Sequence, residues 1–121
     1  DANTLDDYEE STWPPTDGSG AALSLTVTNA TFIKIGSLVF ARADITYPVT
    51  ADASAAVIAG FPFTNAAINV CACSTNSGIS VIGFLNAGAT TMALLNAITN
   101  AAITNVQMSA SNLRFSAVFS V

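Results

Sequence analysis

From residue 21 onward, apolar and polar residues alternate along this chain. Residues 38–47 form the longest such run, and Pro48 ends it. Residues 113–121 repeat the pattern. A period of two places the two residue sets on opposite faces of a β-strand, so both segments are predicted to be strands with one buried face. The predicted buried faces are Val39, Ala41, Ala43, Ile45 and Tyr47 in the first run, and Leu113, Phe115, Ala117, Phe119 and Val121 in the second.

Shorter runs of the same kind lie before and between these two segments of the sequence. Strands are predicted at 23–28 and 31–35, separated by a turn near Asn29-Ala30, and at 57–63, where Pro62 favours an edge position. Residues 68–73 and 79–85 flank a turn at Asn76-Ser77-Gly78 and are predicted to pair as a hairpin. A further strand is predicted at 90–95 after the turn at Asn86-Ala87-Gly88.

Residues 92–105 are the one stretch with a competing helical pattern, because Leu94, Leu95, Ile98 and Ala102 share a helical face. Asparagine and threonine at five positions favour strand and loop instead. Several short strands at spacings of roughly 8 to 12 residues predict an all-β fold, an antiparallel β-sandwich or jelly-roll-like domain. This body is expected to span residues 21–121, preceded by a connecting arm at 1–20.

Charge is scarce and unevenly placed. Only 9% of residues are charged against 51% apolar, and most of the charges lie in the acidic arm. The body carries only Lys34, Arg42, Asp44, Asp52 and Arg114. Three scattered basic residues argue against nucleic acid as a partner. A surface so poor in charge leaves apolar area that a lone soluble domain rarely shows, so we expect the chain to associate with further copies of itself. Polar residues interrupt every apolar run, which argues against membrane insertion.

The residue types that usually carry catalysis are missing or badly placed. The sequence has no histidine, which argues against serine triads and ordinary zinc sites. The acidic pairs Asp6-Asp7 and Glu9-Glu10 are expected to solvate a junction, and Asp44 to be a surface group or a partner for Arg42. Cys71 and Cys73 lie about 6.5 to 7 Å apart on one strand face, too far for an easy disulfide, and are expected to be reduced core residues. The sequence therefore predicts no enzyme, no cofactor and no metal.

Three segments resemble one protein family. Residues 5–15 read Leu-Asp-Asp-Tyr-Glu-Glu-Ser-Thr-Trp-Pro-Pro, which is similar to a Leu-Asp-Asp-Tyr-Glu-Glu-Gly-Thr-Trp-Thr-Pro signature in carboxy-terminal regions of bacteriophage tail fibres and tailspikes. Residues 32–39 resemble that family's Tyr-Thr-Lys-Ile-Gly-Asn-x-Val, and residues 60–63 its Gly-Leu-Pro-Phe. Ser11 and Pro14 depart from the signature, so the backbone near Trp13 is expected to bend differently.

The resemblance implies a β-rich trimeric module at the distal end of a fibre or spike in the virion, assembled in the host cytoplasm and contacting host surface polysaccharide. Two alternatives stay open. One is a trimerisation and folding cap that never touches the host. The other is an accessory domain of a polysaccharide depolymerase whose catalytic residues lie upstream.

Sugar recognition needs an aromatic face and planar amides held by turns. Tyr47, Asn76 and Asn86 lie at strand ends where such loops are expected, and are the candidate carbohydrate contacts. The alternative for Tyr47 is an ordinary half-buried strand residue. Tyr8 and Trp13 are expected to anchor the arm to the body.

Overall fold

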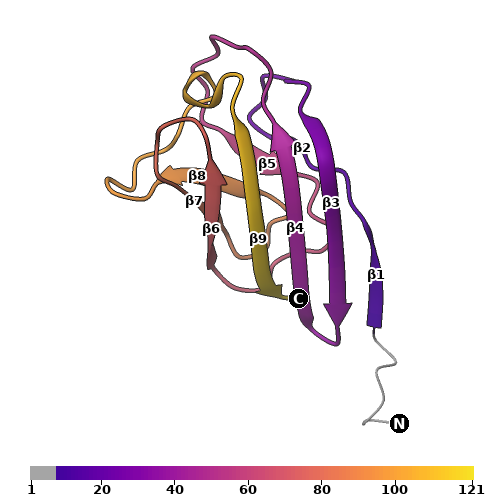
Figure 1. Cartoon of the computed structure of the whole chain (residues 1–121). Helices are drawn as coiled ribbons and strands as arrows, with labels where there is room; N and C mark the ends of the chain where they lie inside the picture. Colours follow the sequence, from indigo (N-terminus) through magenta and orange to yellow (C-terminus); the bar gives the residue numbers. More distant parts are fainter. Residues whose placement is uncertain (1–7) are drawn as a thin grey trace, which may run out of the picture.

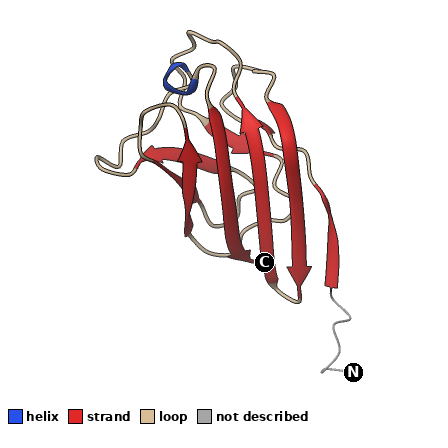
Figure 2. Ribbon diagram, in the orientation of Figure 1, coloured by secondary structure: helices blue, strands red, loops and turns tan. Residues whose placement is uncertain are grey.

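The computed structural model describes residues 8–121. Within them, nine antiparallel strands form one curled sheet, and the only helix is a single 3-10 turn, Val106–Met108 (Figure 2). The all-β, antiparallel prediction is confirmed. The strand order is β1-β3-β4-β9-β6-β7-β8-β5-β2. The bounds are β1 Tyr8–Thr12, β2 Thr16–Asp17, β3 Thr26–Ile35, β4 Leu38–Thr46, β5 Val57–Ala59, β6 Asn69–Thr75, β7 Val81–Leu85, β8 Met92–Asn96 and β9 Asn112–Ser120.

Strand β6 links the two halves of the curled sheet. Its first part, Asn69 to Ala72, pairs with β7, whereas Cys73 to Thr75 pair with β9. Strands β1, β3, β4 and β9 lie side by side in front, while β5 and β8 pass behind them at a steep angle (Figure 1). The hydrophobic core draws residues from both halves, including Ile45 and Phe119 in front and Ile58 and Leu94 behind.

Alternation along β4 and β9 matches burial closely. Val39, Ala41, Ala43 and Ile45 of β4 are buried, as are Leu113, Phe115, Ala117 and Phe119 of β9. Each inward residue of β4 lies opposite an inward residue of β9, for example Ala41 opposite Ala117. The two longest predicted strands are therefore neighbours that share one core face.

Four local predictions differ from the structure. Residues 23–25, predicted to begin a strand, precede β3, which starts at Thr26. Residues near Asn29-Ala30 form no turn, because β3 continues through them and absorbs one extra residue as a bulge between Val27 and Asn29. Strand β5 stops at Ala59, before Pro62, and pairs with β2 on one side and β8 on the other, so it is not an edge strand. Residue Val121 follows β9 and is exposed rather than inward. The hairpin predicted from residues 68–73 and 79–85 is confirmed by the pairing of β6 with β7, and the non-helical course of residues 92–105 is confirmed as well.

The amino-terminal segment supplies both outermost strands of the sheet. Strand β1 pairs with β3 at one end, and β2 pairs with β5 at the other. The chain crosses between the two edges at Trp13 to Pro15, where the Trp13 and Pro15 side chains are buried. Residues 1–7, which include Leu5 and Asp6-Asp7 of the predicted motif, lie outside the described residues.

Candidate functional site

Tyr47 lies in the core just after β4. Its side chain is 2% exposed, and its hydroxyl has no hydrogen-bond partner among the described residues. Burial, with a smaller effect of the Asp17 charge, raises the pKa of this hydroxyl. The ring has no face open to a sugar in this conformation. Tyr47 is more deeply buried than the half-buried strand residue that was the alternative prediction.

Asn76 directly follows β6 and Asn86 directly follows β7, at opposite ends of this hairpin, so the two are not brought together. The backbone N–H of Asn76 donates to Oδ1 of Asn112 at 3.1 Å, and its own Oδ1 accepts from the N–H of Asn112 at 2.9 Å. Asn86 is exposed, and its carbonyl accepts from the Asn65 amide. The five residues of β7 separate the two turns by roughly 17 Å. Asn76 instead joins its loop to β9. Because the two turns are this far apart, one small sugar does not span both positions.

Trp13 and Tyr8 are placed very differently. The Trp13 indole is buried, with its centroid 4.6 Å from the Phe61 ring, and its Nε1 donates to the carbonyls of Thr31 and Arg42 at 3.1 and 3.2 Å. These contacts join the amino-terminal segment to β3 and β4. Tyr8 is 43% exposed, and its hydroxyl donates to Glu10 on the same strand.

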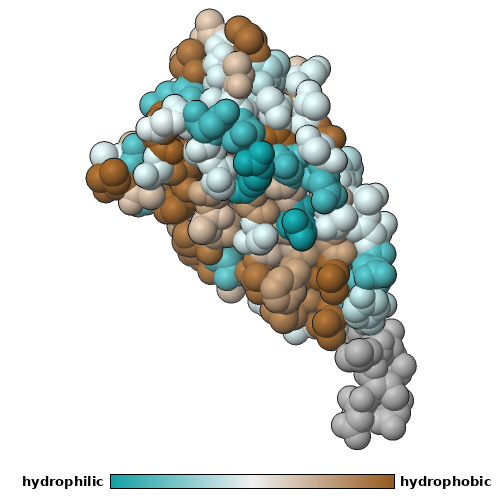
Figure 3. Space-filling view, in the orientation of Figure 1, coloured by the Kyte–Doolittle hydropathy of each residue, from teal (hydrophilic) through white to brown (hydrophobic). Residues whose placement is uncertain are grey.

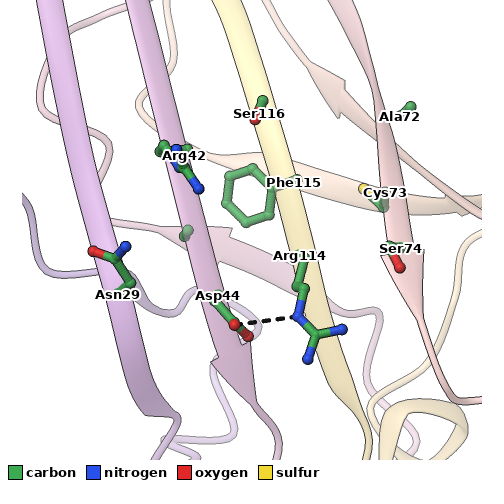
Figure 4. A pocket seen from close by; sticks show the side chains of 10 residues that line it. Asn29, Arg42, Asp44, Ala72, Cys73, Ser74, Arg114, Phe115 and Ser116 are labelled. Atoms are coloured by element: carbon green, nitrogen blue, oxygen red, sulfur yellow. Dashed lines mark hydrogen bonds and ion pairs between the residues drawn. The ribbon is translucent and has the colours of Figure 1, made fainter.

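A hollow of about 460 Å³ lies on the outer face of the sheet, over β4, β9 and β6. It gathers polar and charged side chains from strands far apart in the sequence: Asn29, Arg42, Asp44, Ser74, Arg114 and Ser116 (Figure 4). The hollow lies beside the point where β6 changes partner from β7 to β9. Small side chains there, among them Ala72, Ser74 and Ser116, leave the space open.

An ion pair crosses this hollow. Nε of Arg114 donates to Oδ2 of Asp44 at 3.2 Å, and the two terminal nitrogens of Arg114 point away from Asp44 (Figure 4). Register explains the contact, because Asp44 of β4 lies directly opposite Arg114 of β9. The sequence suggested Arg42 as the partner of Asp44. Arg42 instead lies two residues away on the same face of β4, opposite Ser116.

Two apolar surfaces lie on the outside of the curled sheet. The front patch comprises Ile33 and Ile35 of β3, Leu38 and Phe40 of β4 and Val118 of β9, all exposed (Figure 3). Cross-strand register makes it continuous, because Phe40 lies opposite both Ile33 and Val118. The rear patch comprises Val57, Val70, Ile82, Phe84 and Leu95 on the outer face of β5 to β8, of which Val70 is exposed and the other four are half-buried. Neither patch contains a charged residue.

The cysteines contribute to packing. Both thiols are free, with Cys71 buried and Cys73 partly buried at the rim of the hollow. A hydrogen bond with Cys71, together with burial, raises the pKa of the Cys73 thiol. Cys71 Sγ lies 3.4 Å from Met92 Sδ, above Gly83, where a Cβ would overlap the Met92 sulfur. The two sulfurs thus occupy the space that a side chain at Gly83 would need.

Comparison with protein-family models, with curated proteins and with solved structures finds no match to this chain. Among residues 8–121 no three histidine, cysteine, aspartate or glutamate side chains gather as a metal cluster. No helix in that range has the length and apolar character to span a bilayer. The functional argument therefore depends on the hollow and the two patches.

Proposed function

We propose that this chain is a carboxy-terminal module of a phage tailspike or tail fibre, which assembles as a homotrimer of β-sandwiches and contacts host surface polysaccharide. The single observation that carries the assembly is the presence of two separate apolar patches on the outside of the sheet. The motif in residues 5–15 supports the phage assignment. The core between the two halves of the sheet supports the sandwich interpretation.

Two different patches are what a ring of three copies requires. A two-fold dimer joins one patch to itself, whereas a closed ring joins one surface of each copy to a different surface of the next. The front patch is exposed along β3, β4 and β9, with Phe40 47% exposed at its centre. The rear patch lies on the other half of the curled sheet, on strands β5 to β8. Burying both patches against neighbouring copies removes apolar area from contact with water. The few charged residues on the surface do not compensate for this exposed area in a single copy.

The edge of the sheet also favours self-association. All of β1 is exposed, and its outer side has no strand neighbour within the described residues. The front patch continues up to this edge, because Ile33 and Ile35 lie opposite Glu10 and Tyr8 of β1. An exposed edge strand is a route to uncontrolled pairing unless something covers it. A closed trimer that covers the front patch protects this edge as well.

Light scattering on the purified chain tests the assembly. We expect a mass of about 37 kDa, three times the 12.3 kDa chain. Phe40→Glu and Val70→Glu each place a charge in one patch and are expected to shift the mass toward that of one chain. Val49→Glu is the matched control, because Val49 is 85% exposed outside both patches. A single-chain mass at micromolar concentration contradicts the proposal, as does a dimer broken only by Phe40→Glu.

Contact with polysaccharide is tested separately on a glycan array and by host adsorption. A trimer that gives no array signal, in a phage whose adsorption is unchanged when its outer loops are replaced, would be a folding cap only. The carbohydrate role would then be withdrawn while the trimer stands.

A further inference from the structure

We propose that the hollow over β4, β9 and β6 binds the carboxylate of a hexuronic acid residue in an acidic polysaccharide, through Arg42 and Arg114. This inference rests on the proposed polysaccharide contact and names the class of sugar. It also moves the contact from the loops at Asn76 and Asn86 to the open face of the sheet.

Positive charge is concentrated at this one place. The chain has three basic residues and a net charge of -5, yet two of the three basic side chains border the same hollow. Arg42 and Arg114 are diagonal neighbours on paired strands, since Arg42 lies opposite Ser116. Diagonal positions of this kind are about 7–8 Å apart. Asp44 is the only acidic residue lining the hollow, so the lining carries one net positive charge. An anion therefore finds here an attractive field that the rest of this acidic chain lacks.

Asp44 holds Arg114 in an orientation that suits a carboxylate. The carboxylate of Asp44 accepts from Nε, while the two terminal nitrogens of Arg114 point away from Asp44 (Figure 4). A guanidinium in a fixed orientation offers parallel N–H donors that match two carboxylate oxygens. Asp44 acts in this arrangement as a positioning residue, and the arginines make the contact.

The rest of the hollow suits a sugar ring with hydroxyl groups. Its volume of about 460 Å³ lies within the range of small-ligand sites. Asn29 supplies an amide, and Ser74 and Ser116 supply hydroxyls that both donate and accept. These groups line the hollow together with the two arginines. The site thus combines an anion-binding pair with neutral hydrogen-bonding groups for the remaining hydroxyls.

The test uses NMR of the full chain with ¹⁵N-labelled arginine side chains, titrated with methyl glucuronide. We expect saturable shifts of the Nε–Hε signals of Arg42 and Arg114. Methyl glucoside, which carries a hydroxymethyl group in place of the carboxylate, is expected to cause none. Binding is expected to weaken as salt is raised. Equal shifts with the neutral sugar, or no shift with the acid, would overturn the proposal.

Charge-matched variants separate a built site from general attraction. Arg42→Gln and Arg114→Gln are each expected to weaken methyl glucuronide binding at least about tenfold. Lys34→Gln removes the same charge outside the hollow, where Lys34 lies 5.7 Å from the Phe63 ring, and is expected to leave affinity unchanged. Arg114→Lys keeps the charge but loses the paired donors, and is expected to recover only part of the affinity. If Lys34→Gln weakens binding as much as the arginine variants do, the loss comes from net charge alone, and the proposed site is refuted.

A purely structural ion pair predicts another result. Exposed pairs contribute little to stability, so Arg114→Gln is expected to leave the melting temperature nearly unchanged while binding falls. An unchanged affinity in a folded Arg114→Gln chain would overturn the inference. Trimer mass and binding to neutral polysaccharide are measured on the same samples. If both persist, the proposed function stands and only the acidic-sugar site fails.

Discussion

Replacing Trp13 tests how the amino-terminal segment is joined to the body. Trp13 is 4% exposed, its ring packs on Phe61, and its Nε1 is shared between two carbonyls. Trp13→Ala removes the buried ring and is expected to lower the free energy of unfolding by about 3–5 kcal/mol. For a chain of this size, that loss corresponds to a melting temperature lower by about 10–20 °C. Trp13→Phe keeps an aromatic ring but leaves both carbonyls without this donor, and is expected to cost about 1–3 kcal/mol.

The assay is urea unfolding followed by circular dichroism, at one fixed protein concentration because association adds to apparent stability. Tyr8→Ala is the matched control. Tyr8 is an exposed aromatic of the same segment, so its loss is expected to change stability by no more than about 0.5 kcal/mol. Equal effects of Trp13→Ala and Tyr8→Ala, or a cost below about 1 kcal/mol for Trp13→Ala, would refute the reasoning.

Two further predictions concern single positions. Gly60→Ala and Gly88→Ala both place alanine at a positive φ, but only at Gly60 does the new Cβ overlap the Pro14 carbonyl. We therefore expect Gly60→Ala to lower the melting temperature more than Gly88→Ala does. Equal changes in melting temperature would argue against this contact. The Asn105 amide lowers the pKa of Asp52 below its usual 3.8, so this interaction stabilises the fold above that pH and is lost as pH falls through the lower, folded-state pKa. Thermal melts from pH 6 to pH 2 are expected to show a stability gap between the native chain and Asp52→Asn that closes on acidification, and a constant gap would contradict it.

Much of the fold was predictable because alternation is a local signal. In β4 and β9 every second side chain is buried, and a period of two assigns the two faces without knowledge of the neighbouring strand. The turn at Asn76-Ser77-Gly78 was predictable because these are turn-forming residue types, and Gly78 adopts a positive φ in the structure. The local signal was wrong at Asn29-Ala30, which resembles a turn in sequence. Strand β4 pairs with β3 on both sides of the bulge, so β3 continues through these residues.

The candidate site was not predictable from the same pattern. Alternation places Arg42, Asp44 and Arg114 on outward faces, but it does not say which strand lies beside which. Asp44 and Arg114 are 70 residues apart, and only the pairing of β4 with β9 brings them to 3.2 Å. Tyr47 shows the opposite error. Its position at a strand end suggested a loop contact, whereas the alternation of residues 38–47 places it on the buried face. The structure confirms the buried position, just after β4 ends at Thr46.

The amino-acid sequence alone thus determined an all-β chain and the inward faces of its longest strands, because each depends on residues close together in the chain. The tertiary structure decided the strand order, the change of partner by β6, the hollow beside it and the two apolar patches. These features arise from contacts between distant segments, whose formation depends on how the whole sheet curls around its core.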